Sequence, residues 1–137
     1  MTKGKIKLKI ISPERVVFDE EVDTLVTQGV NGQFGILAGH VPFMSPIEIG
    51  VTKVVQNGVE DYIATMGGTF QVKDDVAVIL TNCAERSSEI DIVRAKAAKE
   101  RAEAKLAQNS ADIDSVRANI AIAKALARLK AAMGKGQ

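Results

Sequence analysis

The stretch Ala84–Ala98, AERSSEIDIVRAKAA, separates two halves of the chain that differ sharply in composition. All three prolines, nine of the eleven glycines and only three alanines come before it. Fifteen alanines occur from Ala84 onward, where there is no proline and no glycine before Gly134. Glycine and proline mark turns between short strands, whereas alanine has the highest helix propensity. The sequence therefore predicts a β domain over residues 1–84 and a helical domain over residues 85–137.

Upstream of this stretch, short apolar runs alternate with turn signals. Residues 5–10 alternate lysine with an aliphatic residue, which is the period of a half-buried strand. Asn57-Gly58 and Asp74-Asp75 each separate two runs rich in β-branched residues, as is typical of tight hairpins. Further apolar runs occupy residues 16–18 and 22–27. Many short strands at this spacing favour an all-β sandwich or a flattened barrel.

One segment of the β half, residues 29–43, is too apolar for an ordinary solvated loop. It reads GVNGQFGILAGHVPF, and its four glycines predict a tightly turning, irregular connection. Its apolar side chains either fold back into the core or face a partner. His40 is the single histidine of the chain and has no second candidate ligand or nucleophile near it in sequence. We therefore interpret His40 as a residue that stabilises a turn.

Downstream, the pattern predicts an antiparallel hairpin of two helices. The first helix begins at Ser88, with Asp91 three residues later as a weak capping box, and extends to about Gln108. The second helix begins after a turn at residues 109–112 and ends before Gly134, a residue suited to the position after a helix.

Large apolar residues are few in the helical half. Their spacing of three and four residues predicts that two neighbouring rows of the second helix are buried. The first row is Ile113, Val116, Ile120 and Ala123, and the second is Ile122, Leu126, Leu129 and Met133. Alanine rows let two helices approach closely, but each alanine buries little area. Such a hairpin gains only a few kcal/mol beyond the chain entropy that it loses. We therefore predict that it needs another surface on which to dock.

Basic residues repeat along each predicted helix. The basic row of the first helix is Arg94, Arg101 and Lys105, and the basic row of the second is Arg117, Lys124 and Arg128. Spacings of seven and four residues return to nearly the same side of a helix. These rows are either a solvated face, partly neutralised by Glu100 and Glu103, or a binding site for a polyanion or an acidic protein surface.

Composition argues against several classes of protein. The net charge is −3 over residues 1–84 and +4 over residues 85–137, which is too mild for a nucleic-acid-binding protein without aromatic residues among the basic ones. No apolar stretch approaches the ~20 residues of a membrane span, and no signal peptide is visible, so we expect a cytosolic protein.

Cys83, the single cysteine, fits a small buried side chain. No phosphate-binding loop, metal-ligand cluster or catalytic triad indicates an enzyme.

Two motifs resemble those of a known family. Residues 35–42, GILAGHVP, are similar to the Gly-Ile-Leu-Pro-Gly-His-x-Pro segment of the ε subunits of bacterial F-type ATP synthases. Residues 90–95, IDIVRA, are similar to the Ile/Leu-Asp-x-x-Arg-Ala motif of the members that bind ATP. The resemblance covers nearly the whole chain, with the motifs in the expected order. One departure is Ala38, which stands where the family usually has proline.

The resemblance implies a ten-stranded β-sandwich followed by a mobile two-helix hairpin. The protein would be a non-catalytic rotor subunit at the cytoplasmic face of the bacterial plasma membrane, peripheral rather than inserted. Its partners would be the γ subunit, the c-ring and the α and β subunits, and not nucleic acid. The hairpin would fold onto the sandwich in a compact state. In an extended state it would rise along γ and restrain ATP hydrolysis.

The resemblance also implies site residues. The ATP-binding residues would be Glu85, Ile90, Asp91, Arg94, Ala95, Arg101, Lys124 and Arg128. The interface with γ and the c-ring would contain Gly32, Gln33, Phe34, His40, Val41, Pro42 and Phe43. In the extended state, Arg117, Lys124 and Arg128 would meet an acidic loop of the β subunit. No cofactor would be required, and ATP, with or without Mg²⁺, would be a regulatory ligand.

Two of these positions depart from the family pattern, and one has a second interpretation. Gln33 replaces an acidic residue of some members, and Lys124 replaces the usual arginine. Because lysine lacks the forked donors of a guanidinium group, Lys124 predicts weaker ATP binding. Asp91 either caps the first helix, binds ATP or does both. A stand-alone nucleotide sensor is the alternative to a rotor subunit, but the apolar segment at residues 29–43 argues against it.

Overall fold

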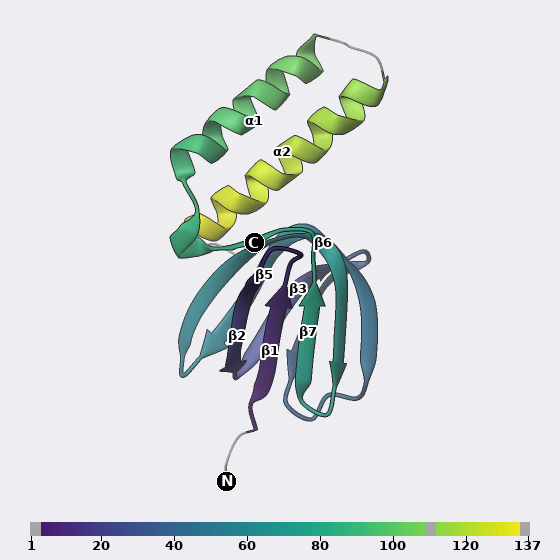
Figure 1. Cartoon of the computed structure of the whole chain (residues 1–137), viewed down its shortest axis with the longest axis vertical. Helices are drawn as coiled ribbons and strands as arrows, with labels where there is room; N and C mark the ends of the chain where they lie inside the picture. The colour runs from purple at the N-terminus through teal and green to yellow at the C-terminus, as the bar shows by residue number, and fades with distance from the viewer. Residues whose placement is uncertain (1–3, 109–111, 135–137) are drawn as a thin grey trace.

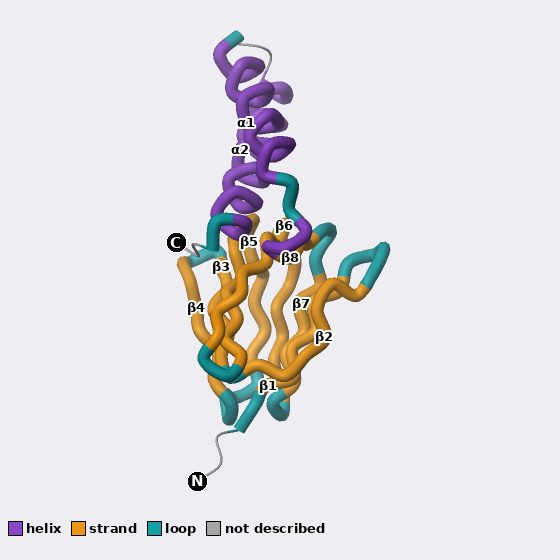
Figure 2. Tube along the Cα trace, turned by 90° about the vertical axis from the view of Figure 1, so that its left-hand side faces the viewer, coloured by secondary structure: helices purple, strands orange, loops and turns teal. Residues whose placement is uncertain are grey.

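The computed structural model of the chain describes residues 4–108 and 112–134. It consists of a β-sandwich with a helical hairpin standing on one end (Figures 1 and 2). The strands are β1 (Ile6–Ile11), β2 (Val16–Val22), β3 (Thr24–Gly29), β4 (Gly32–Leu37), β5 (Phe43–Gln56), β6 (Val59–Lys73), β7 (Val76–Leu80) and β8 (Ala84–Arg86). A 3₁₀ turn, η1 (Ser87–Glu89), leads into the helices α1 (Ile92–Ala107) and α2 (Asp112–Ala132).

The hairpin turns of the sandwich form where the sequence predicts them. Asn57 and Gly58 have φ values of 51° and 82° and connect β5 to β6. Asp74 and Asp75 have φ values of 50° and 61° and connect β6 to β7. Positive φ at both central residues matches the right-handed twist of the flanking strands. Both hairpin predictions are confirmed.

Two long strands, β5 and β6, decide how the sheet closes. The eight strands form one sheet in the order β2-β1-β7-β6-β5-β3-β4, with β8 paired to β6. β6 pairs with β8 over residues 63–65 and with β7 over residues 69–73, and Gly67 and Gly68, with φ of 78° and 132°, lie between these segments. β5 follows the same bend because it pairs with β6 along nearly its whole length. Figure 1 shows both strands curving over the end of the sandwich below the helices.

The expected count of ten strands is therefore wrong. Among the described residues there are eight, since β5 and β6 each run unbroken through the bend and serve both layers. Between the layers lies the main hydrophobic core, whose largest fully buried side chains include Phe18, Phe70 and Leu8. The alternation predicted for residues 5–10 is confirmed, because Ile6, Leu8 and Ile10 are fully buried.

The irregular loop expected over residues 29–43 is largely a strand. Residues 32–37 form β4, which pairs in unbroken register with β3. The glycine at position 29 allows close packing, because a Cβ there would meet the ring of Phe34. Only the connection between β4 and β5 is irregular, and Gly39 in it has a φ of 85°. Of the apolar residues, Ile36 folds into the core as one alternative predicted, whereas Val41 is 70% exposed.

The first helix begins three residues later than predicted. Asp91, not Ser88, is the N-cap of α1, and its Oδ1 accepts a hydrogen bond from the backbone N–H of Arg94 at 3.0 Å. Ser88 lies in the 3₁₀ turn that precedes it. The predicted end of the second helix is confirmed, because α2 ends at Ala132 and Gly134 has a φ of 69°. Most of the turn predicted at residues 109–112 lies outside the described residues.

Alanines rather than the large apolar residues form the buried sides of α2. Ala118 and Ala125 are buried seven residues apart, which places them on the side of α2 that faces α1. Ala127 and Ala131 are buried against the bend of the long strands, in a second cluster with Val51, Ala64 and Met66. The predicted rows are only partly correct: Ile122, Ala123 and Leu129 are half-buried. The exposed members are Val116, Ile120, Leu126 and Met133, for which the prediction is wrong. Ile113 lies outside the residues whose burial is described.

The bend at Gly68 should tolerate no side chain. A Cβ at this position would overlap the carbonyl oxygen of Leu80, and its φ lies in a region that L-residues rarely adopt. We expect Gly68→Ala to lower the free energy of unfolding by at least about 2 kcal/mol, measured by denaturant unfolding.

Gly35→Ala is the matched control for this substitution. Gly35 also lies in a strand, but its added Cβ would make only ordinary contacts, the nearest at 3.6 Å. Equal stabilities of the two variants would contradict the role of Gly68 in the bend.

Candidate functional site

A cavity of about 340 Å³ lies at the base of the hairpin, where four structural elements meet. Its lining residues are Glu85 from β8, Glu89 from η1, Asp91, Arg94, Ala95, Ala98 and Arg101 at and along α1, and Arg128 from α2. The structure thus brings together six of the eight predicted ATP-binding residues. The volume falls within the range of small-molecule sites, about 300–1,000 Å³.

The two remaining predicted residues do not line this cavity. Ile90 is partly buried and packs against the second hydrophobic cluster, below α2. Lys124 is half-buried on α2, one turn before Arg128. Ile90 therefore supports the docking of the hairpin, and Lys124 lies beside the cavity rather than in its wall.

One ion pair connects α2 with the sandwich across the cavity. The Nε of Arg128 donates to Oε1 of Glu85 at 2.7 Å, and both side chains are about one-third exposed. A charge-assisted hydrogen bond of this length is stronger than one between neutral groups. This pair adds to the apolar docking contact, to which Ala127, Ala131 and Ile90 contribute.

Glu89 lines the cavity but was not predicted from the sequence. Its carboxylate accepts hydrogen bonds from both terminal nitrogens of Arg15, at 2.7 and 3.0 Å, and from the backbone N–H of Arg86 at 2.9 Å. The hydrogen bond from Arg15 is the main reason that the pKa of Glu89 lies below its usual value. Because 74 residues separate the two partners, no local pattern in the sequence points to the contact.

The junction between sheet and hairpin carries a second set of contacts. Arg86 forms ion pairs with Glu20 and Asp61, at 3.1 and 3.4 Å, and its guanidinium group lies 4.9 Å from the ring centre of Phe18. The hydroxyl of Ser87 donates to Asp61 at 2.9 Å. Residues 84–89 are therefore fixed to the sandwich, and the sheet continues two residues beyond Ala84.

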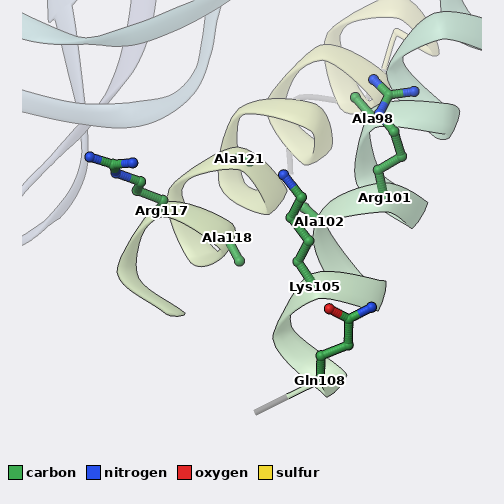
Figure 3. A pocket seen from close by; sticks show the side chains of 8 residues that line it. All are labelled: Ala98, Arg101, Ala102, Lys105, Gln108, Arg117, Ala118 and Ala121. Atoms are coloured by element: carbon green, nitrogen blue, oxygen red, sulfur yellow. The ribbon is translucent and has the colours of Figure 1, made fainter. Parts of the chain in front are cut away.

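A second cavity of about 530 Å³ opens between α1 and α2, farther from the sandwich. Figure 3 shows its lining residues, Ala98, Arg101, Ala102, Lys105, Gln108, Arg117, Ala118 and Ala121. Ala98 and Arg101 line both cavities. The guanidinium group of Arg117 points away from the side chains of Arg101 and Lys105. The two basic rows therefore do not face each other along their full length.

Most residues of the basic rows form no ion pair with an acidic residue that the structure describes. Within the described part of the chain, Arg128 is the only one of the six in an ion pair. Glu103, expected to neutralise the row on α1, pairs with Lys99 instead, at 3.2 Å. Unpaired cations around two cavities can bind an anion without first breaking an ion pair.

Comparisons with known proteins identify the family of the chain. Residues 5–87 match the family profile described as "ATP synthase, Delta/Epsilon chain, beta-sandwich domain", and residues 88–133 match the one described as "ATP synthase, Delta/Epsilon chain, long alpha-helix domain". The chain belongs to the ATP synthase delta/epsilon family. The resemblance to bacterial ε subunits is thereby confirmed.

Curated relatives of this delta/epsilon family member match it over nearly all of their length. The "ATP synthase epsilon chain" of Pelotomaculum thermopropionicum is 48% identical over 126 residues, 92% of this chain and 94% of the relative. That of Syntrophobacter fumaroxidans is 43% identical over 128 residues, 93% of this chain and 96% of the relative.

Solved structures of ATP synthases contain similar chains. One belongs to the Euglena gracilis mitochondrial ATP synthase, in a structure titled OSCP/F1/c-ring, with a TM-score of 0.80 and 27% identity over 94% of this chain and 81% of that one. A chain of the Tetrahymena thermophila mitochondrial enzyme, titled central stalk/cring, shares the fold with a TM-score of 0.66 and 14% identity, over 96% of this chain and 99% of that one. No described helix of this family member is long and apolar enough to cross a membrane.

The residues predicted to contact γ and the c-ring lie in two places. Gln33 lines a cavity beside α2, near Ala123 and Leu126, and Gly32 precedes it at the start of β4. The connection containing His40, Val41 and Pro42 lies instead near the β6–β7 turn, where Gly39 donates to Asp75 at 2.7 Å.

Aromatic residues join the second of these places to the core. The ring of Phe43 lies 5.3 Å from that of Phe34 and 5.8 Å from that of His40, centre to centre. The Nδ1 of His40 lies 2.7 Å from the carbonyl oxygen of Val41, which fits the interpretation of His40 as a turn-stabilising residue. These ring contacts connect three of the predicted interface residues, Phe34, Phe43 and His40.

Proposed function

We propose that this epsilon chain is a non-catalytic rotor subunit of an F-type ATP synthase and that its docked hairpin binds ATP. The observation that carries the proposal is the cavity at the base of the hairpin, where Arg94, Arg101 and Arg128 come together from two helices. Guanidinium groups bind phosphate oxygens through paired hydrogen bonds, and three of them suit a triphosphate.

Other lining residues suit the rest of a nucleotide. Ala95 and Ala98 leave space for a flat base on the wall of α1. Glu85 and Asp91 supply carboxylate oxygens that accept hydrogen bonds from ribose hydroxyls or from an exocyclic amino group. The Asp91 carboxylate already accepts one bond as the N-cap, so it serves as cap and ligand together. Mg²⁺ accompanies the phosphates where it is present.

Binding at this position favours the docked hairpin. The cavity needs Glu85 from the sheet, Arg101 from α1 and Arg128 from α2 at once, so it exists only while the hairpin is docked. A ligand that binds one state stabilises it by RT ln(1 + [L]/Kd), about 2.7 kcal/mol at a hundredfold excess over Kd. A docking contact to which α2 contributes mainly two buried alanines and one ion pair is weak enough for a shift of that size to decide the position of the hairpin.

Undocking releases the basic row of α2. When the Glu85–Arg128 pair opens, Arg128 joins Arg117 and Lys124 as a cation without an acidic partner among the described residues. This row then meets an acidic surface of the β subunit, and the extended hairpin restrains hydrolysis by blocking rotation. The sandwich makes the remaining contacts, with γ, the α subunit and the c-ring, at the cytoplasmic face of the membrane. The exposed side chains of Leu37, Val41 and Met44 supply its apolar contact.

ATP binding is tested by isothermal titration of the isolated chain. Arg101→Ala removes a guanidinium group from the cavity wall, so we expect ATP binding to weaken at least about tenfold, as for the loss of a charge-assisted hydrogen bond of 1.5–3 kcal/mol. Lys124→Arg adds forked donors beside the cavity, so we expect tighter binding.

Lys96→Ala is the matched control. Lys96 lies on α1 and is exposed, but it does not line the cavity, and its substitution removes the same charge. Equal affinities for wild type, Arg101→Ala and Lys96→Ala would contradict the site. Equal affinities for wild type and Lys124→Arg would refute the argument about position 124.

Removal of the hairpin tests the regulatory role. Truncation after Glu89 retains β8 and the contacts of Arg15 and Arg86, so the sandwich should fold and assemble. We expect an ATP synthase assembled with this truncated chain to hydrolyse ATP several-fold faster than the enzyme with the full chain. An enzyme assembled with the full-length Arg117→Ala chain provides a second hydrolysis rate for comparison. This variant keeps the hairpin and loses one cation of the basic row of α2. Unchanged hydrolysis after truncation would show that the hairpin does not inhibit.

A further inference from the structure

Arg15 is held in place by the turn that precedes β2. The carbonyl oxygen of Arg15 accepts hydrogen bonds from the backbone N–H of Ser12 at 2.9 Å and from its hydroxyl at 3.3 Å. Pro13 lies inside this turn and fixes one backbone angle of it. The backbone of Arg15 is therefore positioned by the sandwich, and its side chain reaches from there to the root of the hairpin.

The guanidinium group of Arg15 binds the root of the hairpin at two places. Its two terminal nitrogens donate to the two carboxylate oxygens of Glu89, and Nη2 also donates to the carbonyl oxygen of Ala84 at 3.2 Å. The forked contact fixes the direction of the carboxylate as well as its position. Glu89 Oε1 accepts a further bond from the backbone of Arg86, which closes the 3₁₀ turn. Two residues later the chain reaches Asp91, the cap of α1.

Glu89 is the one carboxylate of the cavity that is neutralised from outside it. Three carboxylates line the cavity, and each would repel a phosphate group if it stood alone. Glu85 pairs with Arg128 within the cavity, and Asp91 accepts a hydrogen bond at the positive end of α1. Glu89 pairs with Arg15, which does not line the cavity. The arginines on the α1 wall, Arg94 and Arg101, form no ion pair with a described residue.

We propose that Arg15 is a positioning residue of the ATP cavity: it holds the carboxylate of Glu89 and neutralises it, so that Arg94 and Arg101 stay available to the phosphates. The inference rests on the proposed ATP binding and adds a residue of the β-sandwich to it. Without Arg15, the Glu89 carboxylate in the cavity wall would lose its ion pair and keep its hydrogen bond from the backbone of Arg86. It would then repel the phosphates directly or attract one of the arginines that they need.

If Arg15 contributed only to stability, its loss would change the free energy of unfolding and not the ATP affinity in a charge-dependent way. Both side chains of the pair are more than one-third exposed, at 46% and 36%, and exposed ion pairs contribute little to the free energy of unfolding. Loss of Arg15 should therefore hardly change the melting temperature. The effect of this loss on ATP binding should depend on whether Glu89 still carries a charge. The loss of a purely structural contact would show no such dependence.

A double-substitution cycle on the full chain tests the inference, with ATP affinity measured by isothermal titration at fixed ionic strength. We expect Arg15→Ala to weaken ATP binding about fivefold, as for one unit charge placed within several ångströms of a phosphate. The double variant Arg15→Ala/Glu89→Gln should return to within about twofold of wild type, because the neutral amide can still accept the Arg86 N–H. Lys5→Ala, which opens the distant Lys5–Asp23 ion pair, is the control and should leave ATP binding unchanged.

An unchanged affinity in Arg15→Ala, or a double variant as weak as the single one, would overturn the inference. Hydrogen exchange in the absence of ATP provides a separate measure of the positioning. The backbone N–H of Arg86, bonded to Glu89, should exchange faster in Arg15→Ala than in wild type, and equal rates would also overturn the inference. If wild type bound no ATP, the proposed function would fail, while the exchange rates would still report whether Arg15 holds Glu89.

Discussion

The proposed regulation depends on the small contact between α2 and the bent strands of the sandwich. Ala127 and Ala131 bury methyl groups against Val51, Ala64 and Met66, and a single ion pair from Arg128 accompanies them. Each alanine removes little apolar area from water, which supports the proposal that the hairpin can leave this position. The contact in turn depends on the bend at Gly68, which brings β5 and β6 under the helix.

The root of the hairpin behaves differently from its docking face. Residues 84–89 pair with β6 and are anchored by contacts of Arg15, Arg86 and Ser87. The firm attachment ends at Glu89, and the helical capping begins at Asp91. A fixed root combined with a weak docking face is the arrangement expected of a segment that changes position as a unit. The proposed ligand binds where these two regions meet, and so it acts on the docking equilibrium directly.

Local signals in the sequence predicted the parts of the fold that depend on neighbouring residues. The turns at Asn57-Gly58 and Asp74-Asp75, the end of α2 at Gly134 and the convergence of Arg94, Arg101 and Arg128 follow from turn chemistry, helix period and the family motif. Properties set by distant contacts were not predicted. The apolar period favoured Val116 and Ile120 for burial, but close helix approach selects alanine. Gly29, at the end of β3, serves packing against the ring of Phe34 rather than a loop. Nothing in the sequence links Arg15 to Glu89.

The most direct measurement is the distance between a spin label on the sandwich and one at the end of α2. Labels at Lys73 and Met133, both exposed, in a Cys83→Ala background would report docking in the isolated chain. With saturating ATP we predict a single distance, the one expected for the docked hairpin, and without ATP a second population at other distances. An identical distribution in both conditions would contradict the claim that the hairpin docks weakly enough for a ligand to decide its position.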